Sequence, residues 1–246
     1  MVRLSAVIEA LSEMLSGRTV VSKEELERKA IRSALKVLGL KMSGFTEDDL
    51  KEVVLSLIET PISIRSAHFP EKILIDGVQF YHLHTKRPDI RELEIAYAEY
   101  IKSKSFLERL GNTMLSADKF FESYRQEGYF LRFYEADNRY AVFFSTITDL
   151  GEDSGLHLQL ASEFDGEYVV IVQTEEKPDE FVKFFKLHSE EFKRGNIKVW
   201  VANPEKWTID PFIGYPRDLK LLKRFKNPKT ASQIESLWRG KVEEID

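Results

Sequence analysis

The amino-acid sequence predicts an α+β protein with a helical amino-terminal domain, residues 1–87, and an α/β carboxy-terminal domain, residues 88–246. Two observations support this prediction. Apolar residues recur with helical spacing over the first sixty residues, whereas apolar runs typical of strands follow residue 129. Between the two patterns, residues 85–90 form the expected linker, because Pro88 ends one element and Asp89 can cap the next helix.

Composition limits the class of protein. Hydrophobic residues make up 43% of the 246 positions and charged residues 31%, which is typical of a soluble globular protein. The absence of cysteine excludes disulfides and Cys-ligated zinc, and together with the many Lys, Glu and Arg residues it is thermophile-like. The amino terminus has the spacing of an amphipathic helix rather than a signal peptide, and no apolar run reaches the ~18 residues of a membrane span. We therefore expect a cytoplasmic protein without membrane contact.

Three amphipathic helices and a β-hairpin are predicted in the amino-terminal domain. Ser22 and Glu25 form a capping box at the start of the second helix, and Thr46 begins the third, whose first turn is acidic. Asp76-Gly77 is a two-residue turn signal within the predicted hairpin. The helices are expected at residues 3–16, 22–38 and 46–60, and the hairpin at residues 73–84.

This order of three short helices and a hairpin resembles the winged-helix family. The resemblance implies a DNA-binding domain whose third helix enters the major groove. Here the exposed face of the third helix would carry Lys51 against five acids, which are Glu47, Asp48, Asp49, Glu52 and Glu59. Because this face would repel phosphates, we expect the acidic amino-terminal domain to contact a protein partner rather than DNA.

The carboxy-terminal domain is predicted around a hairpin at residues 156–176. Asp165-Gly166 is its turn signal, and this turn would pair His157 with Thr174 and Gln159 with Val172. The apolar run at residues 168–172 is typical of a strand that is covered on both faces. The other predicted elements are a helix at 105–127, two strands within 129–147 joined at 136–138, a helix at 179–194, a strand at 197–202 and a loop at 203–211.

The helix at 105–127, the strand at 139–147, the two strands of the hairpin, the helix at 179–194 and the strand at 197–202 follow in the order αβββαβ. This order resembles the PD-(D/E)xK, or restriction-endonuclease-like, nuclease superfamily. The resemblance implies an Asp on the second core strand and Glu-x-Lys on the third, where the carboxylates hold Mg²⁺ and the Lys supports the attacking water. At these positions the sequence has Gln159, Val172 and Thr174, or the neighbouring residues if the register shifts by one. We therefore expect a scaffold that has lost catalysis and needs no cofactor, with His157, Gln159 and Thr174 as a relic pocket.

An active enzyme is the alternative interpretation. Asp153, Glu175 and Lys177 would then form a migrated nuclease site, and only in this case would Mg²⁺ be required. Glu175, Glu176 and Lys177 are more often simply a solvated strand end. The sequence has no Gly-rich phosphate loop, no Gly-x-Ser-x-Gly and no His-Glu-x-x-His, so P-loop hydrolases, serine hydrolases and zinc proteases are not expected.

The residues from Gly214 onward form a basic helical tail in a chain whose formal net charge is −5. Such a region can bind the phosphate backbone of DNA or RNA, although charged runs are also found as solvated faces or paired with an acidic partner. We therefore predict a nucleic-acid-binding or scaffolding protein, with a protein-interaction module as a further alternative. The candidate nucleic-acid-binding residues are Arg217, Lys220, Lys223, Arg224, Lys226 and Lys229.

Overall fold

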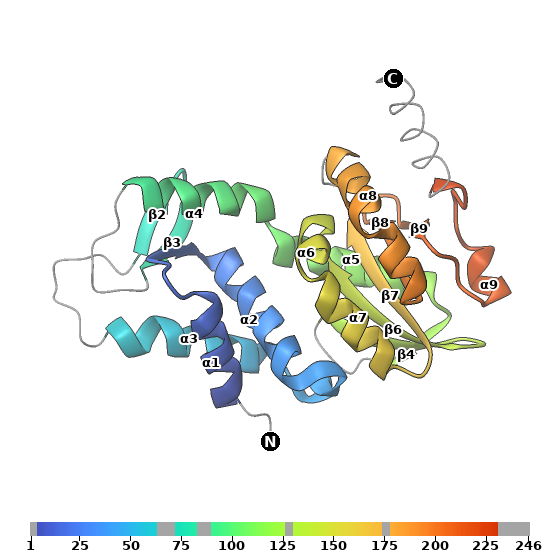
Figure 1. Ribbon diagram of the computed structural model, residues 1–246, viewed down its shortest axis with the longest axis horizontal. Helices are drawn as coiled ribbons and strands as arrows, with labels where there is room; N and C mark the ends of the chain where they lie inside the picture. Colours follow the sequence, from blue (N-terminus) through green and yellow to red (C-terminus); the bar gives the residue numbers. More distant parts are fainter. Residues whose placement is uncertain (1–3, 63–71, 83–89, 126–129, 174–177, 231–246) are drawn as a thin grey trace. The chain divides into compact units, whose positions relative to one another are not determined.

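The computed structural model describes residues 4–62, 72–82, 90–125, 130–173 and 178–230. The chain divides into two compact units, Met1–Glu108 and Arg109–Asp246, and each contains helices and a sheet (Figure 1). The predicted α+β class is therefore confirmed. The predicted boundary between residues 87 and 88 lies outside the described residues. Within the described ranges, no helix is long and apolar enough to cross a membrane.

The first unit combines helices with a three-stranded antiparallel sheet in the order β1-β3-β2. The predicted helices and hairpin are present, and a short strand, β1, precedes the second helix. In chain order the elements are α1 (Leu4–Met14), β1 (Val20–Ser22), α2 (Lys23–Leu38), the 3₁₀ helix η1 (Gly39–Gly44), α3 (Glu47–Ile62), β2 (Lys72–Ile75), β3 (Val78–His82) and α4 (Ile90–Ser103).

Local sequence signals account for the element ends in the first unit. Ser22 Oγ accepts a hydrogen bond from the Glu25 N–H at 3.1 Å and so caps α2. At the start of α3, Thr46 Oγ1 accepts from the Asp49 N–H at 3.1 Å. Asp76 and Gly77 join β2 to β3 with φ angles of 48° and 78°, as the turn signal predicts.

Helix α4 shares an apolar core with the small sheet. Phe80 on β3 is fully buried and lies in one cluster with Val20 on β1 and Ala96 on α4. The rings of Tyr97 and Tyr100 on α4 lie 6.4 and 6.2 Å from the Phe80 ring, measured between centroids. Burial of these aromatic rings attaches α4 to the first unit.

The second unit is built on a six-stranded mixed sheet in the sequential order β4-β5-β6-β7-β8-β9. The three central strands, β6, β7 and β8, run parallel, and the outer pairs are antiparallel. The elements are α5 (Phe106–Phe120), β4 (Ser123–Arg125), β5 (Leu131–Glu135), β6 (Arg139–Ser145), α6 (Ile147–Glu152), α7 (Ser154–Glu163), β7 (Glu167–Gln173), α8 (Pro178–Arg194), β8 (Ile197–Asn203), β9 (Thr208–Ile213) and α9 (Leu219–Leu222).

Helices cover both faces of this sheet (Figure 1). On one face the Phe121 ring, at the end of α5, stacks on Tyr134 of β5, with 4.2 Å between centroids. On the other face α7 and α8 pack on the strands, and Phe184 and Phe185 of α8 lie against Phe212 of β9. The predicted two-sided burial of residues 168–172 is confirmed, because every residue of β7 is buried.

The predicted hairpin at residues 156–176 is wrong in its first arm. Residues Ser154–Glu163 form α7, and β7 pairs in parallel with β6 and β8. Parallel neighbours require a crossover connection, which α6 and α7 supply here. The alternation of leucines in 156–160 imitates a strand, but the buried residues are His157 and Leu160, which are three positions apart on one helix face.

Two further element ends differ from the prediction. The helix expected to run to residue 127 ends at Phe120, and β4 follows it as an edge strand. The segment expected to be a loop at 203–211 contains most of β9, which pairs antiparallel with β8. Thr208, Asp210 and Pro211 made this segment resemble a loop, and pairing with β8 overrides that local preference.

Candidate functional site

The predicted relic pocket does not form as expected. His157 is buried on α7, with its Nδ1 2.8 Å from the Tyr168 hydroxyl, whereas Gln159 is exposed and donates a hydrogen bond to Glu163 at 3.1 Å. The predicted pairing of Gln159 with Val172 is wrong, because Gln159 lies on a helix. Thr174 lies outside the described residues. His157 therefore has a packing role between α7 and β7.

The migrated nuclease site is only partly within the described residues. Asp153 lies at the junction of α6 and α7, where its N–H donates to the Asp149 carbonyl at 2.9 Å and its carbonyl accepts from the His157 N–H at 3.1 Å. Glu175 and Lys177 lie outside the described ranges. Among the residues that are described, no group of three or more His, Asp or Glu side chains could hold a metal ion.

The predicted nucleic-acid-binding residues lie on a well-anchored segment, residues 214–230, which we call the basic segment. Leu221 and Phe225 are buried, and the Phe225 ring lies 5.3 Å from the rings of both Phe120 and Trp200. Arg224 is also an anchor, because its Nη1 donates to the carbonyl oxygens of residues 119 and 120 at the end of α5. The segment is thus held on the sheet face that α5 covers.

The charges of the basic segment are distributed unequally between core and surface. Its one acid, Asp218, is 1% exposed and accepts hydrogen bonds from the N–H groups of Asp137 at 2.7 Å and Lys220 at 3.1 Å. Five of its six cations face solvent, Arg224 being the exception, and the Arg217 side chain is 72% exposed. Among the described residues, Lys220, Lys223 and Lys226 form no ion pair. The exposed cations are Arg217, Lys220, Lys223, Lys226 and Lys229.

Two half-exposed aromatic rings flank the basic segment. Tyr215 is 44% exposed and donates from its hydroxyl to the Pro228 carbonyl at 2.5 Å. Trp207 is 42% exposed in the turn between β8 and β9, and Lys119 Nζ lies 3.2 Å from the centroid of its ring. The Trp207–Lys119 pair could not be predicted from local sequence, because 88 positions separate the two residues.

A polar cavity of about 450 Å³ lies beside Arg217 at the amino-terminal end of β7. Its walls come from the turn between β5 and β6, the turn between α7 and β7, and the basic segment. The lining residues are Asp137, Asn138, Arg139, Phe164, Asp165, Gly166, Glu167 and Arg217. At the cavity wall Arg139 pairs with the exposed Asp165 at 2.5 Å.

A buried ion pair lies next to this cavity. Glu167 is 1% exposed and Lys198 is 5% exposed, with Oε2 of the first 3.5 Å from Nζ of the second. Burial lowers the pKa of the Lys198 ammonium, although the neighbouring Glu167 carboxylate acts in the opposite direction. Glu167 Oε1 accepts from the Arg217 N–H at 3.0 Å. The pair therefore fixes the backbone at the start of the exposed cations.

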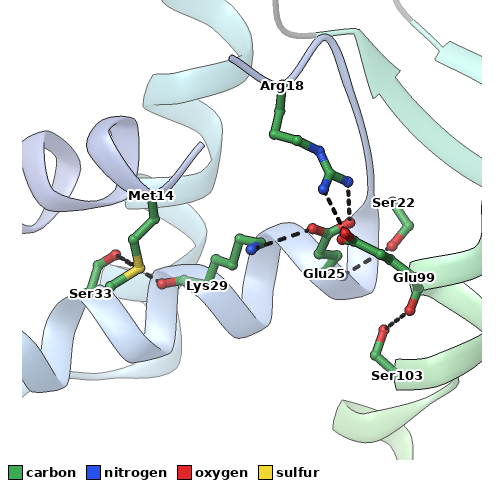
Figure 2. Close-up of polar contacts among 8 residues, drawn as sticks. All are labelled: Met14, Arg18, Ser22, Glu25, Lys29, Ser33, Glu99 and Ser103. Atoms are coloured by element: carbon green, nitrogen blue, oxygen red, sulfur yellow. Dashed lines mark hydrogen bonds and ion pairs between the residues drawn. The ribbon is translucent and has the colours of Figure 1, made fainter. Parts of the chain in front are cut away.

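A second buried glutamate lies in the first unit (Figure 2). The Glu25 side chain on α2 is fully buried, and Arg18 bridges it to Glu99 on α4, with distances of 3.3 Å to Glu25 Oε2 and 2.7 Å to Glu99 Oε1. Lys29 Nζ lies 3.6 Å from Glu25 Oε1. Local spacing does not signal this cluster, because Glu99 is 81 residues from Arg18.

The two carboxyl groups of this cluster have opposite pKa shifts. Burial, followed by the hydrogen bond to Glu99, raises the pKa of Glu25 to about 7. Partial burial acts against ionisation of Glu99, but hydrogen bonds from Arg18 and Glu25 outweigh it and lower the pKa of Glu99 to about 2. Of the two carboxyl groups, Glu25 therefore keeps its proton to the higher pH, and Glu99 is the one that ionises first.

The exposed face of α3 is acidic, as the sequence predicts. Glu47, Asp48 and Glu52 are exposed. Lys51 is exposed among them, and its Nζ lies 3.4 Å from both Glu47 Oε1 and Asp48 Oδ1. The one cation on this face is therefore already paired, which leaves the face with a net negative charge.

The fold and these sites define an α+β protein with a small antiparallel sheet in one unit and a helix-covered mixed sheet in the other. The chain belongs to the family described as "domain of unknown function (DUF6834), C-terminal domain", whose model matches residues 99–227. A second family model, described as "domain of unknown function (DUF6846)", matches residues 6–97. No curated protein matches the chain.

Proposed function

We propose that this protein binds nucleic acid through the exposed cations of the basic segment. The observation that carries the proposal is the separation of charge within this segment: five of its six cations face solvent, and its only acid, Asp218, is buried and hydrogen-bonded. Each phosphate that a Lys or Arg neutralises releases condensed counterions, which gives affinity without sequence preference. The net charge of −5 for the whole chain confines such binding to this surface.

Anchoring of the segment favours binding over a merely solvated charge run. Leu221, Phe225 and Arg224 attach it to the sheet and to α5, so the lysines are presented from an ordered backbone. A preordered surface loses less conformational entropy when it binds than a free tail would lose. Tyr215 belongs to the segment and is 44% exposed, so its ring can stack on an unpaired base of any type.

We also propose that the second unit is a nuclease-like scaffold that has lost catalysis. The order α5, β4, β5, β6, α6–α7, β7 is αβββαβ, and it supports a resemblance to the PD-(D/E)xK superfamily in which the core strands begin at β4 instead of at residues 139–147. On this alignment the second core strand, β5, has no Asp, and the third, β6, has neither Glu nor Lys. Cleavage of DNA or RNA with added Mg²⁺ or Mn²⁺ by the purified chain, abolished in a Glu175→Ala variant, would support the migrated site instead.

A protein-interaction role for the first unit is the second candidate function. The order α1, β1, α2, α3, β2, β3 with the sheet order β1-β3-β2 supports a winged-helix-like unit, in which α3 would be the DNA-reading helix. The acidic exposed face of α3 instead favours a basic protein surface. A Glu52→Lys variant separates the two roles, because tighter nucleic-acid binding is expected only if α3 faces the phosphates.

The test of nucleic-acid binding is a fluorescence-anisotropy titration of labelled single-stranded and double-stranded DNA and RNA at two salt concentrations. The variant carries Lys220→Glu, Lys223→Glu and Lys226→Glu, and leaves Arg224 in place because it caps α5. If the three lysines contact phosphates, loss of about three contacts should reduce the slope of log K against log salt by ~2–3. The matched control carries Lys36→Glu, Lys102→Glu and Lys183→Glu, three exposed lysines elsewhere.

The control separates a local surface from a general charge effect. If both triple variants weaken nucleic-acid binding equally, then the net charge of the protein, and not this surface, determines the affinity. Absence of salt-sensitive binding in the unmodified protein would refute the proposal.

A further inference from the structure

The Arg18 cluster joins two neighbouring parts of the first unit, around residues 18 and 25, to a helix that is distant in sequence. Arg18 lies in the turn before β1, Glu25 in the first turn of α2 and Glu99 in the second half of α4. Figure 2 shows the two carboxyl groups side by side, with the guanidinium group of Arg18 directed at both. The turn of Arg18 and the helix α2 are close in sequence, but α4 is not. The cluster therefore holds α4 by contacts between residues that are distant in the chain.

Two cations, Arg18 and Lys29, meet two carboxyl groups, Glu25 and Glu99, so burial and the adjacent carboxylate, and not net charge, favour a proton on Glu25. The Glu25 side chain is fully buried, and the groups that act on its charge are Arg18, Lys29 on its own helix, and Glu99. β1 has no titratable side chain, and β3 has only Tyr81 and His82, the latter with a side chain outside those described. Two adjacent carboxylates with one of them buried favour a shared proton, because both cannot ionise without repulsion in a poorly solvated site.

We propose that Glu25, Glu99 and Arg18 form a proton-dependent clasp, which holds α4 against α2 when Glu25 is protonated and loosens when Glu25 ionises. In the closed form the Glu25 carboxyl donates its proton to the Glu99 carboxylate, and Arg18 donates to both groups. Ionisation of Glu25 replaces this hydrogen bond with repulsion between two carboxylates. The element that is released, α4, precedes α5, which continues into the second unit.

The direction of the pH effect follows from the two pKa shifts. The folded pKa of Glu25 is raised to about 7, so its stabilising contribution is complete below the unfolded value of 4.5 and is lost as pH rises through 7. The folded pKa of Glu99 is lowered to about 2, so its contribution is present above 4.5 and is lost only as pH falls through 2. Of these two carboxyl groups, only Glu25 titrates between pH 6 and pH 8, so the clasp loosens as pH rises.

The test measures opening of α4 directly by amide hydrogen exchange of the full chain at pH 6 and pH 8, after correction for the intrinsic exchange rate. For a folded pKa near 7 and an unfolded value of 4.5, linkage predicts that protection of α4 falls about tenfold between the two pH values. Glu25→Gln keeps a donor at this position and removes the titration, so its α4 protection should be independent of pH. Glu94→Gln, at an exposed position on the same helix, should keep the dependence of the unmodified protein.

A second measurement keeps the proposal testable if Glu25→Gln fails to fold. The carboxyl carbon of Glu25 in the unmodified protein, followed by NMR, should titrate with a midpoint near pH 7. A midpoint below pH 5 would overturn the proposal, and so would the same loss of α4 protection in Glu25→Gln as in the unmodified protein. These outcomes do not depend on nucleic-acid binding, so the experiments can refute the clasp without refuting the proposed function, and the reverse.

Discussion

Each unit buries a glutamate, and the two units neutralise it differently. In the second unit Glu167 is paired with the buried ammonium of Lys198, so opposite charges balance without a proton. In the first unit Glu25 shares Arg18 with a second carboxyl group, Glu99, and Lys29 Nζ lies 3.6 Å from Glu25 Oε1. Burial and the adjacent Glu99 make Glu25 the pH-sensitive group, because they raise its pKa to about 7, whereas no second carboxyl group shares the ammonium of Lys198 with Glu167 among the described ion pairs.

The largest expected effect on stability is at the buried ion pair of Glu167 and Lys198. Lys198→Met leaves Glu167 buried without its ammonium partner, and loss of one member of a buried pair is expected to lower the free energy of unfolding by about 3 kcal/mol. Urea denaturation followed by near-ultraviolet circular dichroism measures it. The control is the double variant Glu167→Met/Lys198→Met, which removes both charges and should recover most of the loss. A double variant as unstable as the single one would show that packing, not charge, sets the cost.

A smaller effect is expected at the shared cation of the first unit. Arg18→Gln removes the group that bridges Glu25 and Glu99, and because Arg18 is partly exposed the loss should be about 1–2 kcal/mol. The loss should grow from pH 6 to pH 8, since both carboxylates are then ionised and adjacent. Denaturant titrations of the variant and the unmodified chain at both pH values measure it. A loss independent of pH would break the contrast drawn between the two glutamates.

A still smaller effect is expected at the cap that positions Glu25. Ser22→Ala removes the acceptor for the Glu25 N–H and should cost about 1 kcal/mol, in the usual range for a helix cap. Ser22→Asp is the matched control, because Asp also caps helices and should retain most of the stability. Since the cap acts on the backbone, the apparent titration midpoint of Glu25 should stay near neutral in both variants. A midpoint that moves to the ordinary range of a glutamate would show that the cap, and not the cluster, holds the proton.

The smallest expected effect on stability is at an exposed ion pair, and it tests whether burial causes the large effect at Lys198. Arg139 and Asp165 form an exposed ion pair at the cavity near Glu167, and exposed pairs contribute little because water screens them. Arg139→Met should therefore change the free energy of unfolding by less than about 1 kcal/mol. Thermal melts at low and high salt measure it, with little difference expected between them. A loss comparable to that of Lys198→Met would contradict the assignment of the large effect to burial.

Most of the local structure follows from the sequence. Ser22, Thr46 and the Asp76-Gly77 turn mark element ends by interactions within four residues, and the structure contains all three. The buried strand at 168–172 and the helix Pro178–Arg194 follow from apolar runs and helical spacing. The exposed cations of the basic segment also follow from the sequence. In this segment lysines alternate with apolar residues, and the apolar residues are buried while the lysines stay in solvent.

The errors have one physical origin. Residues 154–163 alternate like a strand, and only the parallel pairing of β6 with β7 requires them to form the crossover helix. β9 has residues typical of a loop and becomes a strand because β8 offers it a free edge. Both decisions depend on partners that the local sequence does not contain.

The sequence by itself determined the element ends that are marked by caps and turns, which surfaces carry charge and that no cysteine chemistry is available, because these properties depend on residues within a few positions of one another. The tertiary structure alone decided which strands are neighbours and which charges meet. Arg18 reaches Glu99 across 81 positions, and Glu167 reaches Lys198 across 31. Burial and partner sign, which set whether a glutamate holds its proton, exist only after such distant segments have packed together.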